Sequence, residues 1–185
     1  MSRRPHIDDR VKDAVRAWGG AKNIEQAARA LEEARRDLPA ELRPQLLSEI
    51  AEISAELMVT VLCKTDGLNP DAEPVEVEGE ALHPKQAERL GAWLEDQKLT
   101  AKALGVEPKV WLRELEAGFT RYGKSEAGTE GEEDSAPATA DVARAQRLLG
   151  AKAEAFEARP DPSQSKTAGL TGLLAARAFP KKKKR

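Results

Sequence analysis

Residues 44–62 read PQLLSEIAEISAELMVTVL, and this stretch decides the fold. Its apolar residues recur at intervals of three and four, the spacing that places side chains on one face of an α-helix. Pro44 is tolerated in the first turn, where the backbone N–H has no helical partner. We therefore expect a long helix at the centre of the core, lined by Leu46, Leu47, Ile50, Ile53, Leu57, Met58, Val61 and Leu62.

The segments before this stretch predict two shorter helices. The first carries an apolar face from Ile7 to Trp18 and ends at Gly19-Gly20, where a C-cap glycine is expected. In the second, Asn23 can cap the helix with Gln26 at the reciprocal capping-box position, and Pro39 ends it.

Beyond residue 62 the pattern leaves two alternatives open. Val59-Thr60-Val61 is β-branched and Val75-Glu76-Val77-Glu78 alternates with the period of a strand, which predicts a small hairpin near residues 58–78. A helix followed by a loop over Lys64 to Pro74 is the alternative that we favour.

Three further helices are expected before Gly123. Pro84 opens one, with Ala87, Leu90 and Leu94 on its apolar side and Trp93 on its flank. Thr100 can cap a short second one that ends at Gly105. Pro108 opens the third, which bears Trp111, Leu112, Leu115, Phe119 and Tyr122.

The character of the chain changes after Lys124. Residues 125–140 contain Gly, Ser, Thr, Pro, Ala and acidic side chains with nothing to bury, which predicts a disordered acidic linker. Residues 141–159 form an alanine-rich helix whose apolar face is too thin to fold alone. We expect an isolated helix there, and over residues 160–185 a flexible tail with an amphipathic segment at Leu170 to Phe179. Residues 1–124 then form a helical domain that folds without this arm.

The composition agrees with a mostly α-helical protein. Hydrophobic residues make up 40% of the chain, aromatic residues 4% and charged residues 34%, which favours helices joined by solvated segments over a large sheet core. With Cys63 as the single cysteine, no intramolecular disulfide can form. We expect a cytoplasmic location, or a nuclear one in a eukaryote, with no membrane span and no secretory signal.

The strongest functional signal is the C-terminal block Lys181-Lys182-Lys183-Lys184-Arg185, because the chain as a whole has a net charge of −2. Adjacent lysines suit nonspecific contact with phosphates, since each is a flexible point charge that releases counterions on binding. A nuclear import signal and a solubilising tail are the alternatives. A membrane anchor formed with Leu170 to Phe179 ranks third, because that apolar face is short.

The segment from Leu99 to Leu112 resembles the local pattern of a helix-turn-helix, with Gly105 at the turn. Glu107, Glu114 and Glu116 place negative charge near a bound phosphate, so we favour an ordinary helical corner. If nucleic acid is bound here, the candidate residues are Lys98, Lys102, Lys109 and Arg113.

No residue pattern indicates an enzyme. His6, His83 and Cys63 show neither metal-ligand spacing nor a nucleophile motif, and no cofactor is implied. We interpret His83 as a helix-entry residue and Cys63 as a small buried hydrophobe.

Five acidic residues cluster in the predicted linker and could fold back onto the C-terminal lysines: Glu126, Glu130, Glu132, Glu133 and Asp134.

The function expected from the sequence is that of a non-enzymatic, nucleic-acid-associated or regulatory protein whose basic C-terminal arm contacts phosphates. The alternative is an adaptor or assembly protein in which residues 141–179 dock on a protein partner as they fold. The oligomeric state stays open.

Overall fold

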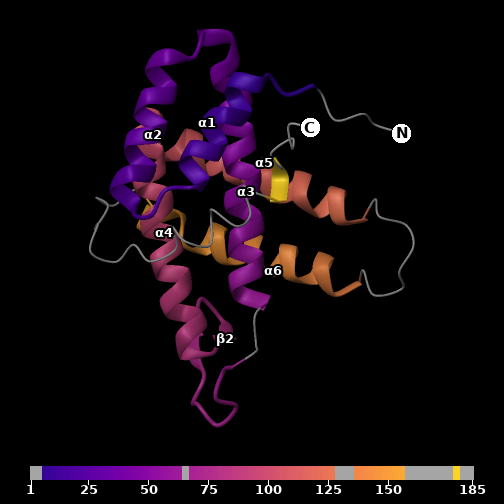
Figure 1. Ribbon diagram of the computed structural model, residues 1–185. Helices are drawn as coiled ribbons and strands as arrows, with labels where there is room; N and C mark the ends of the chain where they lie inside the picture. The colour runs from indigo at the N-terminus through magenta and orange to yellow at the C-terminus, as the bar shows by residue number, and fades with distance from the viewer. Residues whose placement is uncertain (1–5, 64–66, 128–135, 157–176, 180–185) are drawn as a thin grey trace.

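Helix α3, Arg43–Cys63, occupies the centre of the computed structural model, which describes residues 6–63, 67–127, 136–156 and 177–179 (Figure 1). It contacts α1, α4, α5 and α6. The predicted core stripe is confirmed for five residues that are at most 3% exposed, whereas Leu47 is only partly buried: Leu46, Ile50, Ile53, Leu57 and Met58. The side chains of residues 61–63 lie outside the described part, and so does the predicted burial of Cys63.

Helices α1 (Asp9–Gly19) and α2 (Ile24–Asp37) pack against each other as the first two predicted helices. The Oδ1 atom of Asn23 accepts a hydrogen bond of 2.9 Å from the backbone N–H of Gln26. The Gln26 side chain accepts in return from the backbone N–H of Lys22, one residue before the cap. A short 3₁₀ helix, η1 (Ala40–Leu42), then leads into α3.

A two-stranded hairpin follows α3, with its first strand inside the predicted range 58–78 and its second strand beyond it. Strand β1 (Val75–Val77) pairs antiparallel with β2 (Glu80–Leu82). Glu78 and Gly79 have φ angles of 50° and 80°, which is the backbone of a two-residue hairpin turn. This turn selects Glu80–Leu82 as the partner strand, while Val59-Thr60-Val61 stays in α3, as the helical alternative predicted.

Helix α4 runs unbroken from Pro84 to Leu104, so the prediction of two helices here is wrong. His83 caps its start in a complete capping box with Gln86. Thr100 is buried inside the helix, because the apolar stripe continues past it to Ala101 and Leu104. Trp93, expected on the flank, is fully buried, and its indole nitrogen donates a 2.9 Å hydrogen bond to the Ser54 carbonyl oxygen.

Helix α5 (Pro108–Ala127) crosses α3, and α6 (Ala136–Ala151) lies on both of them (Figure 1). The prediction that the alanine-rich helix is isolated is therefore wrong. Val142, Ala145 and Leu149 are buried in the common core, and Phe156 of α7 (Ala153–Phe156) joins them. A face too thin to fold alone suffices here because α3 and α5 offer a complementary apolar surface. Of the predicted linker, residues 128–135 lie outside the described part, and the rest is helical.

Residues 177–179 return to the body of the protein beside α1 and α3 (Figure 1, yellow). Phe179 is 8% exposed and belongs to the core cluster. The Nε atom of Arg16 in α1 donates a 3.2 Å hydrogen bond to its carbonyl oxygen, and Arg177 pairs with Glu56 of α3 at 3.2 Å. This end of the predicted amphipathic segment is thus anchored.

Candidate functional site

Of the four cations predicted at the α4–α5 corner, Lys98 does not reach the surface. Its Nζ atom lies 2.6 Å from Oε1 of Glu95, one helical turn earlier on α4. The two side chains are only 8% and 13% exposed. A lysine held in such a pair is not available to a phosphate.

The turn between α4 and α5 is stabilised by a helix C-cap and by a buried tryptophan. Gly105 adopts a left-handed conformation with φ of 68° and ends α4, and the N–H of Val106 donates to the carbonyl oxygen of Ala101. Trp111 is fully buried, and its Nε1 atom donates a 3.2 Å hydrogen bond to Oε1 of Gln97. This arrangement supports the helical corner that we favoured.

The other three predicted cations lie on the outer surface of this corner. Lys102, Lys109 and Arg113 are exposed, and Glu116 is exposed on the same side of α5. The predicted acidic contribution is therefore present beside the cations. This surface has mixed charge and not the continuous positive charge of a groove that tracks nucleic acid.

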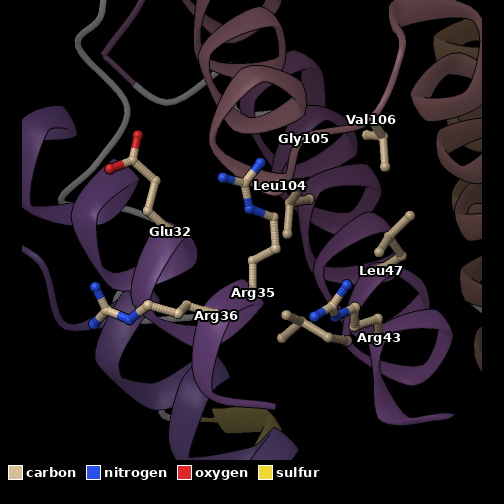
Figure 2. Close-up of a pocket in the computed structure, with 9 residues that line it drawn as sticks. Glu32, Arg35, Arg36, Arg43, Leu47, Leu104, Gly105 and Val106 are labelled. Atoms are coloured by element: carbon tan, nitrogen blue, oxygen red, sulfur yellow. The ribbon is translucent and has the colours of Figure 1, made fainter. Parts of the chain in front are cut away.

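A cleft of about 780 Å³ opens next to the corner, and sequence reasoning missed it. Its lining residues come from the end of α2, the start of α3 and the turn after α4 (Figure 2). We call it the arginine cleft. Three arginines and one glutamate line it together with an apolar wall: Arg35, Arg36, Arg43, Glu32, Leu46, Leu47, Leu104, Gly105 and Val106.

Arg35 reaches across the cleft to the end of α4 (Figure 2). A Cβ atom at Gly105 would overlap the Nη1 atom of Arg35, so glycine is the residue that leaves room for the guanidinium there. The last carbonyl groups of a helix carry partial negative charge, which favours a cation at this place. Gly105 therefore serves both the turn and the position of Arg35.

Two of the three guanidinium groups in the cleft have no charged partner in the described chain. Arg36 pairs with Asp37 at 3.0 Å, and that hydrogen bond raises the pKa of Arg36. Arg35 and Arg43 make neither a hydrogen bond nor an ion pair with the residues that the structure describes. Two arginines that line one cleft without a carboxylate partner among the described residues can accept an anion.

The sequence carried a weak signal for this cleft. Arg35-Arg36 is a basic pair in the last turn of α2, and on the sequence it is indistinguishable from a solvated helix end. The proximity of this pair to Arg43 and Gly105 depends on how α2, α3 and α4 pack. The periodicity of apolar residues within one helix does not predict that packing.

Lys181 to Arg185 lie outside the described residues, but the position from which they continue is set. Phe179 is held by the burial of its side chain in the core and by the hydrogen bond from Arg16 of α1 to its carbonyl oxygen. The lysine block therefore follows the body of the protein after one intervening residue, Pro180.

Neither histidine takes part in a site of the described chain. The Nδ1 atom of His83 accepts from the backbone N–H of Lys85 at 3.1 Å, and its Nε2 lies 3.1 Å from the carbonyl oxygen of Asn69. This confirms that His83 is a helix-entry residue. Within the described ranges, no group of three or more His, Cys, Asp or Glu residues could hold a metal ion.

No family model, no curated protein and no solved structure matches this chain. Among the helices that the structure describes, none has both the length and the apolar composition needed to cross a membrane.

Proposed function

We propose that this protein is a non-enzymatic, nucleic-acid-associated protein whose lysine block, Lys181 to Arg185, contacts phosphates without reading bases. The observation that supports it best is the anchorage of Phe179 on α1. A cationic segment that starts from a fixed point loses less conformational freedom on binding than one at the end of a long free arm. The anchor thus fixes the point on the body from which the charged block continues.

The basic N-terminal segment starts from the same helix. The carbonyl oxygen of His6 accepts a 3.1 Å hydrogen bond from the Gln45 side chain, and the N–H of Asp8 donates to the same side chain at 3.0 Å. Asp8 caps α1 and Arg16 lies in its last turn. With a rise of 1.5 Å per residue, Asp8 and Arg16 are roughly 12 Å apart along the axis of α1. Arg3-Arg4 precede one end of α1 and the lysine block follows Phe179 at its other end, and we propose that both basic segments contact phosphates.

Lys102, Lys109 and Arg113 are the remaining candidates on the body. We assign them phosphate contacts, because Glu116 is exposed on the same side of α5 as Arg113 and because lysines meet phosphates as flexible point charges. Lys98 is removed from the proposed set by its ion pair with Glu95.

The adaptor alternative loses its main support. It required residues 141–179 to present unpacked apolar faces to a partner. The faces of α6 and α7 are already buried against the body, and so is Phe179. Residues 157–176, which include most of the Leu170 to Phe179 segment, lie outside the described part.

The experiment compares the intact protein with a variant in which Lys181 to Arg185 are replaced by Gln. Binding to two unrelated oligonucleotides is titrated at several salt concentrations. For every phosphate that the variant no longer binds, the slope of log affinity against log salt should fall by roughly 0.9 for duplex DNA or about 0.7 for a single strand. The decrease should be equal for both sequences.

A matched control removes five positive charges elsewhere on the body, with Gln at the half-buried Arg89 and at four exposed positions: Lys22, Arg29, Lys85 and Lys124. This control should keep most of the salt slope. The proposal fails if the intact protein does not bind at low salt, or if the slope decreases equally in the control and in the neutral-tail variant. A sequence-dependent decrease in affinity would show that the tail reads bases.

A further inference from the structure

We infer that the arginine cleft binds the phosphate group of a nucleotide unit, either in a nucleic-acid backbone or in a free mononucleotide. Arg35 comes from α2 and Arg43 from the start of α3, and both lack a charged partner in the described chain. Guanidinium groups bind phosphate oxygens through paired N–H donors. Two such groups from different helices define a site that no single helix face could form.

The shape of the cleft supports a ligand larger than an inorganic ion. Its volume of about 780 Å³ lies within the range of small-molecule sites. Leu46, Leu47, Leu104 and Val106 supply an apolar wall beside the arginines. A phosphate that carries a sugar and a base can place its charge on the guanidinium groups and its less polar part on that wall.

Glu32 makes a distinct contribution. It lines the cleft from α2, one turn before Arg35 and Arg36. Its carboxylate lowers the positive charge that an incoming phosphate meets, so Glu32→Gln should strengthen phosphate binding while Arg35→Gln and Arg43→Gln weaken it. A general effect of surface charge would give the same two signs, so a site is distinguished by comparison with a charge removed outside the cleft, Arg29→Gln.

The biological meaning of this site rests on the proposed function, but its test does not. The full chain with Lys181 to Arg185 replaced by Gln is titrated with adenosine monophosphate, with orthophosphate and with a short single-stranded oligonucleotide. The backbone amide signals of Gly105 and Val106 are followed by NMR. Removal of the lysines ensures that any saturable shift at these amides arises from the body of the protein.

We expect saturable shifts with adenosine monophosphate, weakened about tenfold or more by Arg35→Gln and by Arg43→Gln, since hydrogen bonds to charged groups contribute on that scale. Arg29→Gln, an exposed substitution on α2 outside the cleft, is the matched control and should leave the shifts unchanged. Circular dichroism confirms that each variant is folded.

The outcomes separate the two claims. Binding of adenosine monophosphate without the oligonucleotide supports a free-nucleotide site, even if the intact tail binds no nucleic acid. Shifts by the oligonucleotide that disappear in the Arg35 and Arg43 variants support binding of a nucleic-acid backbone. An absence of saturable shifts with all three probes overturns the inference, and so does an Arg29→Gln effect as large as that of Arg35→Gln.

Discussion

Gly118 of α5 lies against the backbone of Ala51 in α3, where a Cβ atom would be 2.6 Å from the Ala51 carbonyl oxygen. The absence of a side chain lets the two helices approach closely at their crossing. Arg121, one turn further along α5, donates a 3.0 Å hydrogen bond to the carbonyl oxygen of Ser48. The crossing is therefore held by a backbone approach and a polar contact beside it.

We expect Gly118→Ala to destabilise the protein by about 1–3 kcal/mol, because a methyl group there forces the two backbones apart. Inside a helix, alanine is normally the more stable residue by roughly 1 kcal/mol. Gly91→Ala in α4 is the matched control, since nothing lies within 4 Å of its added Cβ atom. That substitution should stabilise the protein. Chemical denaturation measures both free energies of unfolding, and a stabilising Gly118→Ala would contradict the close crossing.

Local signals predicted the helices well, and packing decided what they missed. The periodicity of residues 44–62 predicted α3 and the burial of Ile50 and Leu57. Thr100 was misread as a helix start because its capping preference is local, whereas the surrounding core keeps α4 continuous. The arginine cleft and the Gly118 crossing depend on the angles between helices. No pattern within one helix determines those angles.

The burial of α6 leads to a prediction opposite to the one from the sequence. Leu149 is fully buried, so Leu149→Ala should lower the free energy of unfolding by about 2–5 kcal/mol. Gln146→Ala on the same helix should change it by no more than about 0.5 kcal/mol, as is usual for partly exposed positions.

Truncation after Lys124 should likewise lower the thermal midpoint, because it uncovers the faces of α3 and α5 that α6 covers and the part of α4 that α7 contacts. Thermal unfolding of the intact and truncated chains measures the shift. An unchanged midpoint would show that residues 1–124 are self-sufficient.

Glu80 links the hairpin to α6, and its ionisation should affect stability. A hydrogen bond from Arg147, together with the charge of Arg144, lowers the pKa of Glu80 below its ordinary value of 4.5. A lowered pKa in the folded state stabilises the protein above pH 4.5, and this stabilisation disappears as the pH falls through the folded pKa. We therefore expect the difference in stability between the wild type and Glu80→Gln to shrink below pH 4.5.

Unfolding in denaturant at a series of pH values measures this difference. Arg147→Gln removes the main partner, so its stability should depend less on pH in the same range than that of the wild type. A difference between the wild type and Glu80→Gln that stays constant from neutral pH to below pH 4.5 would exclude this role for Glu80.

Phe179 gives a way to separate the position of the lysine block from its charge. Phe179→Ala removes a side chain that is 8% exposed and should cost about 1.5–3 kcal/mol of stability. The lysines are unchanged, so the number of bound phosphates, and with it the salt slope, should stay the same.

Affinity for an oligonucleotide should fall at every salt concentration, because the lysine block no longer starts from a fixed point. Phe179→Leu, which keeps an apolar side chain, should retain most of the affinity. If Phe179→Ala binds as tightly as the wild type, the anchor contributes only to folding and the tail binds by charge alone.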